Sequence, residues 1–231
     1  MTVKETNILY YDAIAAEYDG QLHNDERNLH IRDIVSRTFV KVVKGHFVID
    51  FGGGTGQDFG WLLKHRFQIV FCEPSRAMRQ IAQERRMLEF PDSEILFFED
   101  EQADFRNWAD SFPFENKMDA VLANFAVINC IPDIYSLFDK LAIALKQGGH
   151  VVALVLDDHF ISQMRTNPGG AIRSFISGKP VRLYVNHNNH RQEVYLHSMR
   201  SIRNACKLKF HLISLTRLKG YGFRLIHLMR K

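Results

Sequence analysis

Three glycines at alternate positions follow directly after an apolar segment of the chain. Gly52, Gly54 and Gly56 form a GxGxG pattern behind residues 47–51. Glycines between a buried strand and a helix let the backbone approach a ligand closely, with the first N–H groups of the helix facing it. The spacing differs from the GxGxxG of dinucleotide-binding turns. The pattern therefore predicts a ligand-binding turn and leaves its ligand open.

An acidic residue stands where it could bind a ribose beside that turn. Glu73 directly follows the next apolar segment, residues 68–72, and lies 17 residues after Gly56. A carboxylate at the end of a second strand can accept hydrogen bonds from both hydroxyl groups of a ribose. Nicotinamide sites share this feature, so it predicts a nucleoside ligand without choosing among nucleosides.

The elements that must position these residues alternate between short apolar strands and helices, an order typical of βαβ units and a parallel sheet. Two final strands joined by residues 219–222 must be antiparallel. The predicted fold is α/β and Rossmann-like, with seven mostly parallel strands, an antiparallel last strand, helices on both faces and a small cap after strand five. The strands expected are 47–51, 68–72, 94–98, 119–123, 151–156, 210–216 and 223–229, with a further pair at 181–185 and 193–196 around a turn at 186–190.

Six segments, taken in order, resemble the motifs of class I S-adenosylmethionine-dependent methyltransferases. The likeness covers residues 7–157, and the terminal hairpin is similar to the antiparallel seventh strand of that family. The resemblance implies a transferase that uses S-adenosyl-L-methionine and releases S-adenosyl-L-homocysteine. The matching segments are YYDAIAAEYD (10–19), VIDFGGGTG (48–56), FCEPS (71–75), FFEDEQADF (97–105), DAVLANFAVINCIPD (119–133) and LAIALKQGGHVVALVLD (141–157).

The resemblance also implies which residues surround the cofactor. Asp50 would orient the glycine turn and lie near the methionyl amino group, or else only cap the following helix. Asp100 would border the adenine, or else be a solvated loop acid like its neighbours. The complete cofactor set implied is Tyr18, Asp50, Gly52, Gly54, Gly56, Glu73, Pro74, Asp100, Glu101, Asn124 and Phe125.

Candidates on the acceptor side are fewer. His159 follows the fifth expected strand, at the sheet edge where ligands of α/β proteins bind, and is either a general base or an ordinary loop residue. Tyr11 and Tyr18 either face the transferred methyl group or pack in the core. His187 and His190 lack the further ligands of a metal site, so no metal is predicted. The substrate-side set is Tyr11, Asn129, His159, Arg182 and Tyr184.

The acceptor is predicted to be a small molecule. Nucleic-acid adenine methylases of the family carry two prolines after strand four, whereas residues 124–127 read NFAV, so a nucleic-acid substrate is not expected. Residues 158–200 are expected to form a basic cap, which suits an acidic acceptor or one tethered to a carrier protein, with O-methylation favoured over N- or C-methylation. The residues that make this cap basic include Arg165, Arg173, Lys179, Arg182 and Arg191.

The basic residues are concentrated in the C-terminal third. Residues 160–231 contain 14 Lys or Arg and one acid, a balance of +13, whereas residues 1–159 contain 16 basic and 25 acidic residues, a balance of −9. Such asymmetry indicates either a solvated basic face or an acidic partner. The alternative function is therefore a methyltransferase-like binding module that docks RNA or an anionic surface. A nicotinamide oxidoreductase would instead need GxGxxG and a parallel sixth strand.

Length and composition predict a globular protein of one domain. The chain has 231 residues, of which 46% are hydrophobic and 24% charged. No apolar run approaches the about 20 residues that span a bilayer, residues 1–6 lack the apolar run of a secretory signal, and the three cysteines are far apart. These features predict that the protein is located in the reducing cytoplasm. They predict no oligomeric state. The parts expected are N-terminal helices over the site (1–45), a cofactor core (46–157), a substrate cap (158–200), and the last helix and hairpin (201–231).

Overall fold

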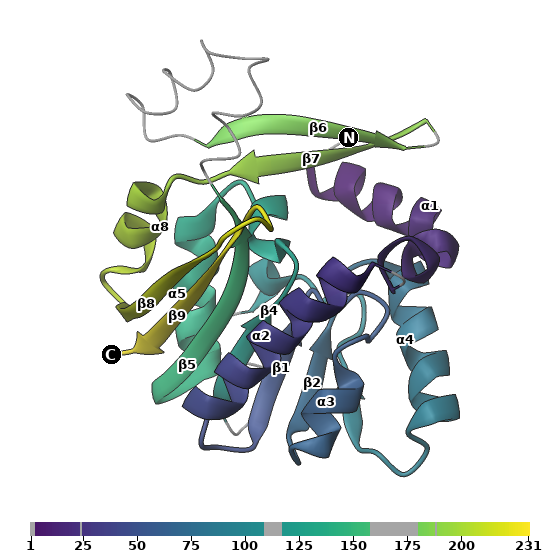
Figure 1. Cartoon of the computed structure of the whole chain (residues 1–231), viewed down its shortest axis with the longest axis horizontal. Helices are drawn as coiled ribbons and strands as arrows, with labels where there is room; N and C mark the ends of the chain where they lie inside the picture. The colour runs from purple at the N-terminus through teal and green to yellow at the C-terminus, as the bar shows by residue number, and fades with distance from the viewer. Residues whose placement is uncertain (1–2, 24, 109–116, 158–179, 188) are drawn as a thin grey trace.

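Seven strands in the order β3-β2-β1-β4-β5-β9-β8 form the central sheet in the computed structural model of the protein (Figure 1). The first five pair in parallel, and β9 lies antiparallel between β5 and β8. The predicted fold class, with its antiparallel terminal hairpin, is confirmed. The structure describes residues 3–23, 25–108, 117–157, 180–187 and 189–231. The strands of this sheet are β1 (Phe47–Phe51), β2 (Gln68–Cys72), β3 (Ile95–Phe97), β4 (Met118–Ala123), β5 (Leu145–Leu156), β8 (Phe210–Leu218) and β9 (Phe223–Arg230).

Helices cover both faces of the sheet because its central strands are apolar on both sides. In β4, Ala120 and Leu122 pack with α2 and α3, while Val121 and Ala123 pack with α5 and α8. Figure 1 shows α2 lying across the sheet. Within the described part of the chain, no helix is both long and apolar enough to cross a membrane. The helices are α1 (Val3–His23), α2 (Glu26–Val42), α3 (Phe59–Lys64), α4 (Arg76–Glu89), α5 (Ile134–Ala144) and α8 (Met199–Cys206), with short 3₁₀ turns η1 (Phe105–Asn107) and η2 (Val127–Cys130).

The strand β5 begins earlier than the sequence predicts. The prediction places Gly148 and Gly149 between helix and strand, whereas pairing with β4 already begins at Leu145. The register between the two strands shifts before His150, and Gly148 has a φ of +76°. The glycine pair therefore forms an irregularity inside β5 and does not separate the helix from the strand. The sequence does not reveal this, because the start of β5 is set by its pairing with β4.

A separate two-stranded sheet lies beside α1 (Figure 1) and consists of β6 (Val181–His187) and β7 (His190–Leu196). Its strands continue into the residues predicted as a turn, because His187 already pairs with His190. This hairpin makes up most of the described part of the predicted cap, and residues 158–179 and 188 of that cap lie outside the described residues.

We expect Asp119 to stabilise the start of β1. Its Oδ2 accepts hydrogen bonds from the N–H groups of His46 at 2.9 Å and Phe47 at 3.0 Å, and its Oδ1 accepts one from Lys146 Nζ at 2.7 Å. Asp119→Ala leaves these donors without their acceptor and should lower the free energy of unfolding in urea by about 1–2 kcal/mol. The exposed Asp92→Ala is the control, with a change within about 0.5 kcal/mol. Equal unfolding midpoints for the two variants would contradict this role.

Candidate active site

The glycine turn lies where β1 and β2 end side by side. The N–H of Gly52 donates to the carbonyl of Cys72 at 2.7 Å, which joins the turn to β2. Gly54 has a φ of +59°, a conformation that favours glycine. A Cβ on Gly53 would lie 2.2 Å from the Phe71 ring. Backbone, rather than side chains, therefore forms this wall of the site.

Glu73 lies beside the turn, directly after β2, and two backbone N–H groups hold its carboxylate. Its Oε2 accepts from Gly54 at 3.0 Å, and its Oε1 accepts from Ser75 at 2.8 Å. The side chain is buried, and burial raises the pKa of Glu73 to about 7 although both hydrogen bonds act to lower it. Each oxygen keeps a further lone pair, so the carboxylate can accept hydrogen bonds from a diol.

A second buried acid, Asp50 of β1, lies against the turn at Gly53. No described residue donates a hydrogen bond to Oδ2 of Asp50, and burial, followed by the charge of Asp58, raises the pKa of Asp50 well above its usual range. Asp58 itself pairs with Arg32 at 2.5 Å and accepts from Asn124 Nδ2 at 3.1 Å. Since one arginine faces two carboxylates, this part of the site favours an additional cationic group such as an ammonium.

The loop after β4 is held in a strained conformation at the cavity. Phe125 and Ala126 have φ angles of +47° and +65°, which cost about 1–3 kcal/mol each for residues other than glycine. The N–H of Phe125 donates to Oδ1 of Asn124 at 3.0 Å, and the guanidinium of Arg32 lies 4.8 Å from the centre of the Phe125 ring. Such strain persists where surrounding contacts fix the backbone, as these contacts do.

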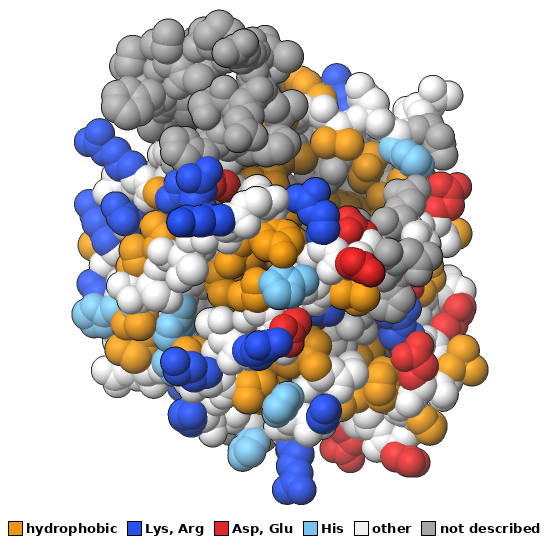
Figure 2. Space-filling view, in the orientation of Figure 1, with side chains coloured by type: hydrophobic (Ala, Val, Ile, Leu, Met, Phe, Trp, Pro, Cys, Tyr) orange, Lys and Arg blue, Asp and Glu red, His pale blue; other side chains and the backbone are white. Residues whose placement is uncertain are grey.

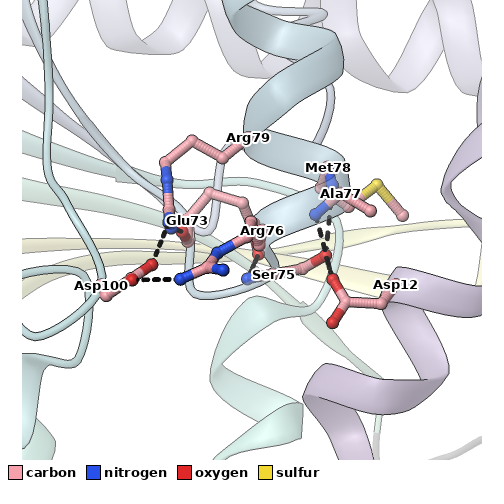
Figure 3. Close-up of polar contacts among 8 residues, drawn as sticks. All are labelled: Asp12, Glu73, Ser75, Arg76, Ala77, Met78, Arg79 and Asp100. Atoms are coloured by element: carbon pink, nitrogen blue, oxygen red, sulfur yellow. Dashed lines mark hydrogen bonds and ion pairs between the residues drawn. The ribbon is translucent and has the colours of Figure 1, made fainter.

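Polar side chains of α1 attach this helix to the glycine turn and to α4. Asp12 accepts hydrogen bonds from the Ser75 hydroxyl at 2.6 Å and from the backbone N–H two residues further on at 3.1 Å (Figure 3). Asp19 accepts from the Thr55 hydroxyl and pairs with Arg85 of α4. The helix is therefore fixed over the end of the sheet at two points.

A third attachment joins α1 to β7. The amide of Asn7 donates to the carbonyl of Glu193 at 3.0 Å and accepts from its N–H at 2.7 Å, as a neighbouring strand would. The Tyr11 hydroxyl accepts from Gln192 Nε2 at 2.6 Å and lies 3.5 Å from the sulfur of Cys130. These hydrogen bonds thus join α1 to the β6–β7 hairpin.

A cavity of about 320 Å³ connects these groups, within the range of small-molecule sites. It reaches from the glycine turn to α1 and to the beginning of α5. The residues predicted from the sequence that line it are Tyr11, Tyr18, Asp50, Gly52, Gly54, Glu73, Pro74, Asn124 and Phe125.

Other predicted residues lie elsewhere. Asp100 pairs with Arg76 and Arg79 at 2.5 Å each (Figure 3), and its side chain is 57% exposed. Hydrogen bonds from Arg76 and then Arg79 hold the pKa of Asp100 below its usual range. His159 lies outside the described residues. The described residues predicted for the site that do not line the cavity are Gly56, Asp100, Glu101, Asn129, Arg182 and Tyr184.

Asn129, Arg182 and Tyr184 contact other residues of the protein rather than the cavity. Asn129 is buried, and its Nδ2 donates to a β7 carbonyl at 2.8 Å while its Oδ1 accepts from the last N–H of β5 at 2.9 Å. Arg182 pairs with Glu193, and its guanidinium lies 5.1 Å from the centre of the Tyr184 ring. Asn129 therefore joins backbone segments, and Arg182 contacts other residues of the hairpin.

Sequence reasoning missed Arg32, Asp58 and Asp104, which also line the cavity. Asp104 lies there together with Phe105, beside the segment where Asp100 and Glu101 were expected. The available signal was weak: Asp104 is an acid directly after Ala103, which is buried, whereas residues 99–101 are three consecutive acids with no apolar residue among them.

The sequence matches a protein family described as a methyltransferase domain over residues 23–227. The chain belongs to this family, and the resemblance to class I methyltransferases is confirmed. No curated protein sequence matches the chain significantly.

Solved structures of methyltransferases share the fold. The DhpI complex with S-adenosylhomocysteine has a TM-score of 0.68 at 16% identity, over 98% of this chain and 96% of that chain. The N-methyltransferase NodS from Bradyrhizobium japonicum WM9, in complex with S-adenosyl-L-homocysteine, has a TM-score of 0.68 at 11% identity, over 97% and 98%. Magnesium protoporphyrin IX methyltransferase from Synechocystis PCC 6803 has a TM-score of 0.59 at 15% identity, over 89% and 80%.

We expect Asp19 to keep α1 in place. Asp19→Ala removes the contacts with Thr55 and Arg85, so backbone amides of α1 should exchange with deuterium at least about ten-fold faster. Mass spectrometry of the α1 peptides measures this rate. The exposed Glu84→Ala on α4 serves as the control. Exchange in α1 that stays at the wild-type rate in Asp19→Ala would rule out this attachment.

Proposed function

We propose that this protein transfers the methyl group of S-adenosyl-L-methionine to a small-molecule acceptor. Membership of the methyltransferase family and the shared fold define the class of reaction. The observation that carries the choice of cofactor is the pair of carboxylates in one cavity. Glu73 can accept from a ribose diol, and Asp50 has a buried oxygen for an ammonium group. Such a pair fits a nucleoside joined to an amino acid better than it fits a dinucleotide.

The remaining cavity residues suggest roles for the other parts of this cofactor. Asp104 and the neighbouring Phe105 would border the adenine, in place of the Asp100 and Glu101 that the motif alone implied. Arg32 would lie near the methionyl carboxylate. Tyr18 lies close to Gly54, since a Cβ on that glycine would be 3.8 Å from its ring, and would cover the nucleoside.

Methyl transfer depends more on aligning the acceptor atom with the methyl group than on a strong acid or base in the protein. When bound, the cofactor supplies a methyl group on a sulfonium, which an acceptor atom displaces in line. Burial raises the pKa of Tyr11 well above its usual range, so its phenol stays protonated. Because Gln192 donates to that oxygen, the phenol can offer its own proton to an acceptor atom. Removal of a proton by His159 stays a prediction.

The acceptor class proposed is an oxygen nucleophile, acidic or carrier-bound. Arg182 and Arg191 lie near the Glu193 carboxylate in the described part of the cap, which leaves one positive charge in excess among these three residues. Similar solved structures include NodS and the glycopeptide N-methyltransferase MtfA, so amines belong among the candidates to be tested.

The direct test combines binding and transfer. Titration calorimetry with S-adenosyl-L-methionine and S-adenosyl-L-homocysteine should show one site, and methyl-labelled cofactor should label members of a library of phenols, carboxylic acids, phosphates and amines. Absence of both binding and transfer would overturn the proposal. Binding without transfer to any member would contradict the proposed acceptor class only.

We expect Glu73→Gln to weaken binding of S-adenosyl-L-homocysteine by about 10- to 100-fold, because a charged acceptor of two hydroxyl hydrogen bonds is lost. Titration calorimetry measures the change in Kd. Glu84→Gln is the matched control, since Glu84 lies on the exposed surface of α4. Equal affinities for both variants would exclude Glu73 from the ribose site.

A further inference from the structure

Part of the basic C-terminal third is neutralised within the fold. Arg182 pairs with Glu193, and Arg217 and Arg224 both pair with the buried Asp157. Residues 197–231 nevertheless contain nine Lys or Arg and no Asp or Glu. The ion pairs within the fold therefore do not account for the remaining basic residues of this segment.

Several of them meet at one corner of the molecule. Lys207, Leu208 and Lys209 form the turn between α8 and β8. The N–H of Lys231 donates to the carbonyl of Lys209 at 3.0 Å, and its Nζ donates to the carbonyl of Lys207 at 2.5 Å, so the end of β9 lies against this turn. We call this surface the basic corner, and it consists of Arg203, Lys207, Leu208, Lys209, Arg230 and Lys231.

Among the described residues, no Asp or Glu side chain forms an ion pair with the basic corner. Arg230 donates instead to the carbonyl of Leu145, which leaves its charge uncompensated. Figure 2 shows Lys and Arg side chains gathered at the left edge of the view, over α8, without acidic side chains among them. The corner therefore presents a net positive field to an external partner.

The corner also presents an aliphatic side chain. Leu208 is 76% exposed and stands between two lysines, and Ile213 on the neighbouring β8 is 50% exposed. A bilayer surface accepts this combination, because an apolar side chain enters the headgroup region while flanking lysines contact anionic phosphates. Single-stranded RNA sites instead combine cations with aromatic side chains for stacking, and the basic corner contains no aromatic residue.

We propose that the basic corner docks this methyltransferase on an anionic lipid bilayer. The corner lies away from the cavity: Arg230 pairs with Phe210 at the beginning of β8, whereas the cavity is at the carboxyl ends of β1 and β2. Figure 1 shows the C-terminus and the α8–β8 turn on the side of the molecule opposite α1. Docking therefore leaves the cavity accessible, and it does not depend on the proposed acceptor.

Vesicle sedimentation without cofactor tests this proposal. The full chain should sediment with vesicles of two-thirds phosphatidylcholine and one-third phosphatidylserine, and stay in solution with phosphatidylcholine alone. Binding should weaken as salt is raised, because exposed charges are screened. Equal retention on both vesicle types, or on neither, would overturn the proposal and leave the methyltransferase activity untouched.

Two pairs of variants locate the contact. Lys207→Glu with Lys209→Glu should weaken vesicle binding at least roughly 25-fold, since each basic residue near an anionic surface contributes about five-fold. Lys44→Glu with Lys64→Glu changes the net charge equally at exposed positions elsewhere and should have a much smaller effect. Leu208→Ser should weaken binding about ten-fold, while Leu88→Ser, at an 83% exposed position on α4, should not.

Two results would contradict the proposal that the basic corner binds the bilayer. One is equal binding by the corner variants and their matched controls. The other is tighter retention of a short single-stranded RNA than of the anionic vesicles, unaffected by Leu208→Ser, which would assign the surface to nucleic acid. Thermal unfolding curves and the Kd for S-adenosyl-L-homocysteine, both expected at wild-type values, confirm that each variant is folded.

Discussion

The buried carboxylate of Glu73 joins the two turns on which the site depends. Parallel pairing sets Phe51 opposite Cys72, so the chain leaves β1 and β2 at the same edge of the sheet. One oxygen of Glu73 accepts from the glycine turn after β1, and the other accepts from Ser75 at the beginning of α4. Without these two donors, a buried acid with a raised pKa would only destabilise the fold. With them, it fixes both turns and still faces the cavity.

The position of α1 follows from that junction. Ser75 caps α4 and is in turn bound by Asp12 of α1, while Asp19 reaches the glycine turn and Asn7 reaches β7. One helix therefore contacts both the turn that follows Glu73 and the strand β7 that carries Gln192. This arrangement explains how Tyr11 and Tyr18, on the same helix, come to line one cavity.

Local patterns were sufficient to predict the sheet and to place the glycine turn and Glu73 at the ends of neighbouring strands. The glycine turn and Glu73 each directly follow a short apolar segment in the sequence, and in the structure these segments are the strands β1 and β2. The positions of the other predicted residues depend on contacts between segments that are distant in the sequence. Asp100 pairs with Arg76 and Arg79 of α4, which no motif around residue 100 reveals, and Asp104 lies on the cavity instead. Asn129 binds the backbone of β7 and β5, and β5 begins at Leu145 because β4 offers a partner there.

The central claim is that the ionised carboxylate of Glu73 binds the ribose. Because burial raises the pKa of Glu73 to about 7, part of the Glu73 population is protonated at pH 7 and must lose that proton when the ribose binds. Calorimetric titration of S-adenosyl-L-homocysteine at pH 7, in buffers of different ionisation enthalpy, measures protons released per site. The wild type should release more protons per site than Glu73→Gln, and its Kd should fall as the pH rises through 7. Equal proton release by the two proteins, with a wild-type Kd that does not change with pH, would contradict the account.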